Sequence, residues 1–173
     1  MAAPKEIQFG DSPPRYSFML NPYPEERLWR CPLCEQKTGQ RKLPLLIHVD
    51  PSNLIALNYT CRYCRECDLL VAHKHEIEHL LTELFRRSDP AVVGNMYLII
   101  GTVEKSVWRE GLKQPKGIAE FLPYASDFAT YYKELRLTRP GYYHVDQEPP
   151  VMEPPSSKEW VKANFTSRQK QPL

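Results

Sequence analysis

The sequence contains no apolar stretch that approaches the roughly 20 residues a helix needs to cross a bilayer. Its start also lacks the basic segment and the apolar segment that together mark a secretory signal. We therefore expect a soluble cytoplasmic protein with no membrane association. Because such a compartment keeps thiols reduced, the cysteines are expected to bind a metal rather than to form disulfides.

The chain also has little net charge, with a formal value of +2 at pH 7. Between residues 27 and 68, seven Lys or Arg residues stand against four Asp or Glu residues. A nucleic-acid surface usually carries a much stronger basic stripe. The charge pattern therefore favours a protein partner, with nucleic acid kept as the alternative.

Glycine is scarce and proline is abundant, with seven and seventeen residues respectively. The prolines crowd at the two ends of the chain, where their fixed φ and missing N–H disfavour regular structure. We therefore expect a proline- and aromatic-rich arm at 1–24 and a proline-rich, disordered tail at 144–173.

Five cysteines stand in two short clusters. Cys31 and Cys34 form one Cys-x-x-Cys pair, and Cys61, Cys64 and Cys67 offer two more pairs in overlapping registers. A structural Zn²⁺ takes four tetrahedral ligands, and two such loops supply four thiolates aimed at one point. The sequence therefore predicts one structural zinc ion.

The choice between the two registers depends on the residue that follows the second cysteine. A zinc-binding turn favours a residue there that tolerates positive φ, and Asp68 after Cys67 suits this better than Arg65 after Cys64. The predicted ligands are therefore Cys31, Cys34, Cys64 and Cys67, with Cys61 as the alternative ligand.

Two cysteine knuckles joined by a predicted hairpin make residues 29–71 resemble the zinc-ribbon superfamily. The resemblance covers about a quarter of the chain and implies a fold rather than an activity. It implies a zinc ribbon at 25–72, and the strand and helix patterns that follow predict an α/β extension at 73–143 packed on this ribbon.

Apolar runs predict the strands. Residues 43–49 and 54–59 flank the turn signal Asp50-Pro51-Ser52-Asn53 and predict a β-hairpin. Two further strands are expected at 69–72 and 97–103.

Helical spacing of apolar residues predicts a helix over 75–87, with a stripe that runs from Ile77 to Phe85. Aromatic residues predict a second helix over 126–137. The expected fold class is therefore α+β, a zinc ribbon with a small antiparallel sheet, two amphipathic helices packed on it, and proline-rich arms.

The segment His75-Glu76-Ile77-Glu78-His79 spells the H-E-x-x-H motif of zinc metalloproteases. In such a site both imidazoles bind zinc and the glutamate activates water. At about 100° per residue, however, His75 and His79 point away from the apolar stripe, so we expect a solvated His/Glu face. A metal-dependent hydrolase at this motif is kept as the alternative function.

The order His48, Asn53 and Cys61-x-x-Cys64 resembles the HNH nucleases, and this resemblance implies a metal-dependent hydrolase centred on His48. Ile47 stands where that family carries an acidic residue or a histidine, so the HNH pattern is incomplete.

The paired cysteines are the stronger signal in this sequence. It therefore favours a non-catalytic structural-zinc module that presents a surface to a protein or nucleic-acid partner.

Overall fold

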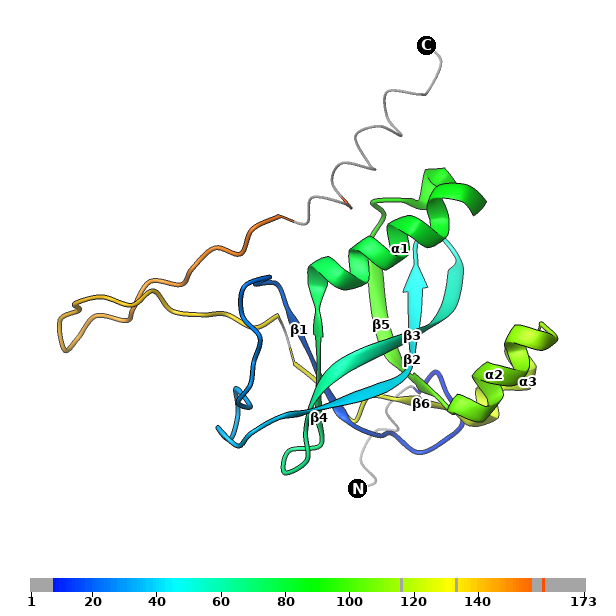
Figure 1. Ribbon diagram of the computed structural model, residues 1–173, viewed down its shortest axis with the longest axis horizontal. Helices are drawn as coiled ribbons and strands as arrows, with labels where there is room; N and C mark the ends of the chain where they lie inside the picture. Colours follow the sequence, from blue (N-terminus) through cyan, green and yellow to red (C-terminus); the bar gives the residue numbers. More distant parts are fainter. Residues whose placement is uncertain (1–7, 116, 133, 157–159, 161–173) are drawn as a thin grey trace, which may run out of the picture.

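A computed structural model of the chain describes residues 8–115, 117–132, 134–156 and 160. Within these residues, seven strands form one mixed sheet that curls into a half-barrel (Figure 1). The strands lie in the order β6-β5-β2-β3-β4-β1-β7. Their bounds are β1 (Ser17–Asn21), β2 (Gly39–Val49), β3 (Asn53–Cys64), β4 (Leu69–His73), β5 (Tyr97–Val103), β6 (Ala125–Asp127) and β7 (Thr130–Tyr131).

The hairpin of β2 and β3 is the longest pairing in the sheet, and it contains the predicted runs 43–49 and 54–59. The strands predicted at 69–72 and 97–103 are confirmed as β4 and β5. β5 pairs with β2 and β4 pairs with β3, both antiparallel, so the hairpin lies in the middle of the sheet.

The concave face of the sheet holds the main core. Alternate residues of β2, such as Leu45 and Ile47, point to this face and are fully buried. Helix α1 (Lys74–Ser88) closes the face with Ile77, Leu81 and Phe85, which confirms the helix predicted over 75–87.

The opposite face of the sheet, here called the outer face, is covered at its two ends. Helix α2 (Lys105–Lys113) packs Val107 against Leu46 at one end. The other helical elements that the structure describes are short, namely α3 (Ile118–Phe121), η1 (Pro90–Val92) and η2 (Leu122–Tyr124). Cysteines and apolar residues of β1 and β4 form a separate small core at the other end. Among the helices that the structure describes, none has the length and apolarity of a membrane span.

The expected fold class is wrong. The sheet is larger than a zinc ribbon and is mixed, because β1 pairs parallel to both β4 and β7. The helix predicted over 126–137 is replaced by β6, β7 and extended chain. Along this segment the amides of Ala129, Tyr132 and Leu135 donate to carbonyls of Tyr16, Phe18 and Leu20.

The physical reason for this difference is the pairing with β1. Phe128 stacks on Phe18 with ring centroids 4.6 Å apart on the core side, whereas Tyr132 and Leu135 pack against the small outer core. A helix would place all of these side chains on one side. The extended segment instead lets Phe128 pack on the core side while Tyr132 and Leu135 pack on the outer face.

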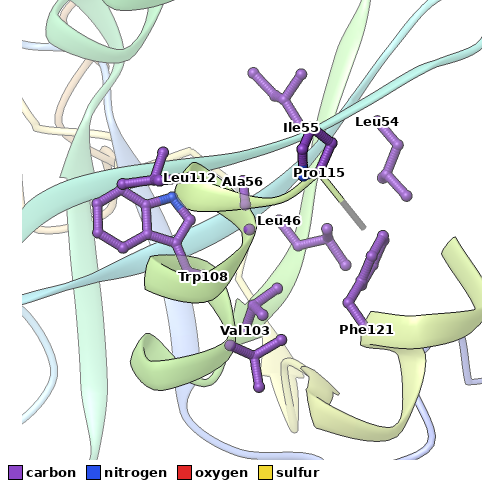
Figure 2. Close-up of a pocket in the computed structure, with 11 residues that line it drawn as sticks. Leu46, Leu54, Ile55, Ala56, Val103, Trp108, Leu112, Pro115 and Phe121 are labelled. Carbon is purple, nitrogen blue, oxygen red and sulfur yellow. The ribbon is translucent and has the colours of Figure 1, made fainter. Parts of the chain in front are cut away.

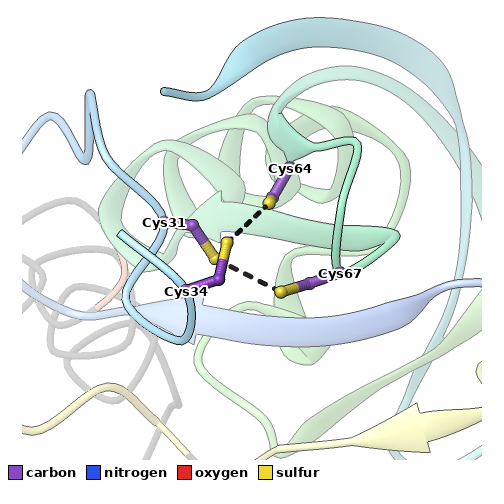
Figure 3. Close-up of side chains that lie close together, drawn as sticks. All are labelled: Cys31, Cys34, Cys64 and Cys67. Atoms are coloured by element: carbon purple, nitrogen blue, oxygen red, sulfur yellow. Dashed lines mark hydrogen bonds between the residues drawn. The ribbon is translucent and has the colours of Figure 1, made fainter. Parts of the chain in front are cut away.

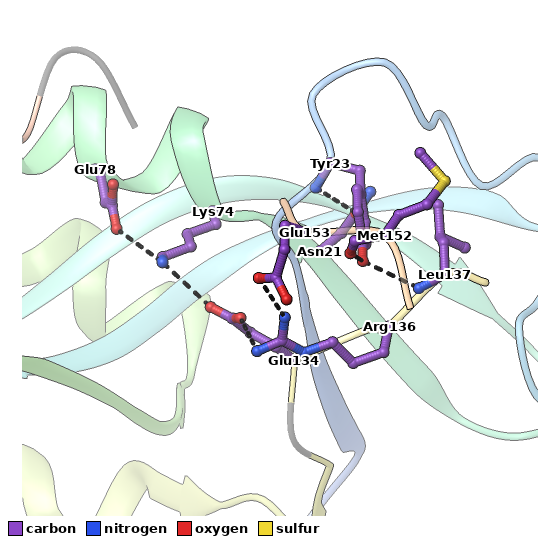
Figure 4. A network of polar contacts seen from close by, with 9 residues as sticks. All are labelled: Asn21, Tyr23, Lys74, Glu78, Glu134, Arg136, Leu137, Met152 and Glu153. Carbon is purple, nitrogen blue, oxygen red and sulfur yellow. Dashed lines mark hydrogen bonds and ion pairs between the residues drawn. The ribbon is translucent and has the colours of Figure 1, made fainter. Parts of the chain in front are cut away.

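Polar contacts tie the segment after β7 to β1 and α1 (Figure 4). The buried Tyr23 hydroxyl donates to the Met152 carbonyl at 2.7 Å and accepts from the Leu137 amide at 3.1 Å. Lys74 of α1 lies 3.2 Å from a carboxylate oxygen of Glu134. Residues 134–137 and Met152 are therefore bonded to the body of the protein. The disorder expected for 144–173 stays a prediction, because 157–159 and 161–173 lie outside the described residues.

Tyr23→Phe should destabilise the protein by about 1–2 kcal/mol, because it removes one donor and one acceptor for two backbone groups. Chemical denaturation measures this change, and limited proteolysis should cut the segment around Met152 earlier than in the parent chain. The matched control is Tyr142→Phe, since the Tyr142 side chain is exposed. Equal stabilities of the two variants would contradict this account of the segment.

Candidate metal centre

Two tight turns bring four cysteines to the outer face of the sheet (Figure 3). The first turn lies between β1 and β2 and carries Cys31 and Cys34, with its backbone closed by bonds from Glu35 N to the Cys31 carbonyl and from Cys31 N to the Gln36 carbonyl. The Leu33 amide also points at the Cys31 sulfur, at 3.4 Å.

The second turn joins β3 to β4 and carries Cys64 and Cys67. Asp68 has a φ of 51°, as the sequence argument for this register requires. Glu35, in the equivalent place of the first turn, has a φ of 64° although it is not one of the residue types that favour this region. The Asp68 carboxylate accepts a 2.6 Å hydrogen bond from Tyr63, which braces the second turn.

The four sulfurs of Cys31, Cys34, Cys64 and Cys67 all lie within 4.8 Å of one another. The Sγ atoms of Cys31 and Cys67 are 3.9 Å apart, and those of Cys34 and Cys64 are 3.4 Å apart. A tetrahedral zinc ion with Zn–S bonds of about 2.3 Å sets its sulfurs about 3.8 Å apart. All five cysteines are free thiols, so the cluster has the spacing of a metal site rather than of disulfides.

Hydrogen bonds and burial shift the pKa values of these thiols in different directions. A backbone hydrogen bond at Gln36 holds the pKa of Cys34 below its ordinary value. Burial raises the pKa of Cys64, and the hydrogen bond to Cys34, together with burial, raises that of Cys67 to about 12. Four thiolates therefore need a positive charge at their centre, and a bound metal ion supplies one.

An arginine of β3 holds the first turn in place. Arg62 donates to the Thr38 hydroxyl at 2.7 Å and to the Thr38 carbonyl at 2.8 Å. The Thr38 hydroxyl in turn donates to the Leu28 carbonyl at 2.6 Å. The Arg62 guanidinium also lies over the Trp29 ring, 4.8 Å from its centroid. The cysteine spacing gives no sign of this support, because residue 62 meets residue 38 only through the strand register.

The alternative ligand Cys61 lies elsewhere. Its side chain points into the main core on the concave face, where it is completely buried among apolar residues. Burial raises its pKa well above the ordinary range, with a further contribution from the nearby Glu76 carboxylate. The structure therefore brings together the four predicted ligands and separates the fifth cysteine from them.

The H-E-x-x-H residues lie beside an open cavity of about 430 Å³ that is lined by Tyr59, His75, Glu76, His79 and Leu80. His79 is exposed as expected, but Glu76 is half-buried and accepts a hydrogen bond from Tyr59. His75 is also half-buried, and its Nδ1 atom is buried without a hydrogen-bond partner.

Glu78 departs further from the solvated face expected at this motif. It is buried, accepts a 3.0 Å hydrogen bond from Tyr97, and lies 3.9 Å from Lys74. Among the residues that the structure describes, the four cysteines are the group whose ligand atoms converge, and the two motif histidines do not join a third ligand.

His48 lies at the turn end of the hairpin, where its Nδ1 atom is 3.7 Å from the Asp50 carboxylate. The strand β3 separates this end from Cys64 by roughly 35 Å, at about 3.3 Å per residue. The residues that resemble an HNH nuclease are therefore not assembled into one site.

A second cavity, of about 280 Å³, lies under α2 on the outer face (Figure 2). Its lining is apolar and includes Leu46, Ala56, Trp108 and Phe121.

Comparisons of the chain with protein-family models, with curated proteins and with solved structures find no significant match.

The Cys61 thiol should resist alkylation at about pH 8, because its pKa is raised and its side chain has no exposed surface. Mass spectrometry of peptides after timed iodoacetamide treatment measures the rate at this position. The rate should equal that of global unfolding and should rise with added denaturant. Modification of Cys61 in the folded protein, faster than unfolding, would contradict its placement in the core.

Proposed function

We propose that this chain is a non-catalytic binding module whose fold is held by one structural zinc ion. The observation that carries the proposal is the convergence of four sulfurs, from two separate turns, to within 4.8 Å of one another. The proposed ligands are Cys31, Cys34, Cys64 and Cys67.

Zinc is favoured over other divalent ions by the ligand type and the geometry. Thiolates are soft ligands that select zinc over magnesium or calcium, and a tetrahedral arrangement of four of them is typical of structural zinc. Four protein ligands leave no open position for water or substrate, so a closed site of this kind supplies stability rather than catalysis.

The position of the site explains what the ion would stabilise. Cys31 precedes β2, whereas Cys64 and Cys67 enclose the turn from β3 to β4. The small outer core around the cysteines contains few buried apolar residues besides Met19, Leu69 and Val71. Zinc would therefore hold a part of the outer face that apolar packing holds weakly.

The surface near the site supports an interaction role. Trp29 is 65% exposed and Leu33 is 45% exposed, and both belong to the first cysteine turn. Large exposed side chains on a rigid loop are frequent in binding surfaces. The partner of this surface is a protein or a nucleic acid.

Purified protein should contain about one equivalent of zinc, and Cys34→Ser or Cys67→Ser should lose both the zinc and cooperative unfolding. The reason is that a structural site contributes on the order of 10–16 kcal/mol of apparent binding free energy that is coupled to folding. Elemental analysis and thermal denaturation measure the two effects.

Cys61→Ser is the matched control, because it changes a cysteine outside the cluster. It should keep one equivalent of zinc and cost about 1–2 kcal/mol of core packing. Loss of zinc in this variant but not in Cys67→Ser would show that the ligand set is wrong.

The hydrolase alternative is tested by the double change His75→Ala and His79→Ala. Zinc content should remain at one equivalent, since neither imidazole belongs to the cysteine cluster. Elemental analysis of the parent and of the double variant makes the comparison. A fall from two equivalents to one would instead identify a second metal site and support the hydrolase.

A further inference from the structure

We propose that the outer face of the β2–β3 hairpin binds single-stranded nucleic acid along a strip between the cysteine turns and helix α2. This inference rests on the proposed function, because the zinc site would hold one end of the strip. The strip consists of Gln40, Lys42, Thr60 and Arg62, and is called the exposed strip below.

The strand register places these four side chains together. Gln40 pairs with Arg62, and Lys42 pairs with Thr60, so each pair projects from the same face of the hairpin. The neighbouring pair of Arg41 and Cys61 projects to the core side instead, since successive residues alternate. Gln40, Lys42 and Thr60 are exposed and Arg62 is half-exposed, so the described residues leave these four side chains largely uncovered. The next pair on this face is Pro44, which is buried, and Asn58, which is half-buried.

One exposed indole stands at the cysteine end of the exposed strip, and a half-buried indole lies further along the outer face. At the cysteine end, Trp29 is 65% exposed and lies against the Arg62 guanidinium. Toward α2, the half-buried Trp108 lines a cavity together with Ala56, which is four residues from Thr60 on the outer face of β3 (Figure 2). Ala56 and Arg62 are six residues apart on β3, which is roughly 20 Å.

Basic side chains gather near the cysteine end of the hairpin. Asp50 lies at the turn end, away from the cysteines, and Arg41 projects to the core side. Of the charged residues between 27 and 68, six basic and three acidic residues remain toward the cysteine end outside the core side. Arg30 and Lys37 are exposed and form an isolated β-bridge beside Trp29, so they extend the positive charge of Lys42 past the indole.

These features favour a polyanion over a protein partner. Lysine is depleted from the centres of protein–protein interfaces, whereas lysine and arginine around an exposed aromatic ring are the groups that bind a phosphate backbone and stack a base. A duplex keeps its bases stacked inside, so an exposed indole beside basic side chains suits an unpaired base. The roughly 20 Å between Arg62 and Ala56 would hold about four nucleotides, the low end of the range for one small domain.

Arg62 and Lys42 of the exposed strip and the adjacent Trp29 have separate roles. Arg62 is already bonded to Thr38 and stacked on Trp29, so it positions the indole. Lys42 contacts the phosphates, because its charge is exposed and no ion pair is described for it. Trp29 stacks on a base.

Fluorescence anisotropy with labelled oligothymidylate and oligouridylate of about 15 nucleotides, at about 50 mM salt, tests the proposal on the full chain with its zinc content measured. The parent protein should bind at least one of the two. Trp29→Ala should weaken binding about tenfold, and Trp29→Phe should restore most of the loss, because stacking needs a ring. Lys42→Gln should lower the slope of log affinity against log salt by about 0.7.

The control is Arg86→Gln, which removes an exposed positive charge on α1, outside the outer face. Its affinity should stay close to that of the parent. Equal effects of Lys42→Gln and Arg86→Gln, or binding of duplex as tight as that of single strands, would overturn the proposal.

Absence of binding by protein that holds one equivalent of zinc would also overturn it, while leaving the zinc module intact with a protein as its partner. Absence of zinc would instead contradict the proposed function. The two failures are therefore distinguished by elemental analysis of the same sample.

Discussion

The structure depends on the ladder between β2 and β3, which pairs eleven residues of β2 with β3 without a slip. Because side chains alternate along each strand, this register sends Tyr59 and Cys61 into the core under α1 and sends Cys64 to the outer face. A shift by one residue would exchange these faces. The core, the cysteine cluster and the exposed strip therefore follow from one set of backbone bonds.

The two faces of the sheet are stabilised in different ways. The concave face has a continuous apolar core that includes side chains from β1 to β5 and α1. The cysteine end of the outer face has a much smaller core, and there burial raises the pKa of Cys64, while the hydrogen bond to Cys34, together with burial, raises that of Cys67. A metal ion would remove this electrostatic cost and would replace the missing apolar contacts with four bonds.

The polar groups beneath α1 give the carboxylates of the H-E-x-x-H segment partners within the protein. The Glu76 carboxylate accepts a hydrogen bond from Tyr59, and the Glu78 carboxylate accepts one from Tyr97, so both carboxylates are partners of tyrosine hydroxyls on the core side of the sheet. Burial and these carboxylates raise the pKa values of both tyrosines, which keeps the hydroxyls protonated as donors. Glu76 and Glu78 of this segment therefore act as hydrogen-bond acceptors for the tyrosines beneath α1.

The sequence by itself determined the hairpin, the strands β4 and β5, helix α1, and the four cysteines that converge, because these depend on local alternation, helical spacing and the turn residue Asp68. The tertiary structure alone decided the parallel placement of β1 and the extended path of 126–137, since both depend on pairing between residues more than 40 positions apart. It also decided the burial of Glu78, because helical spacing does not show that Tyr97 lies opposite. Local patterns fix which segments are strands, and only long-range pairing fixes their neighbours.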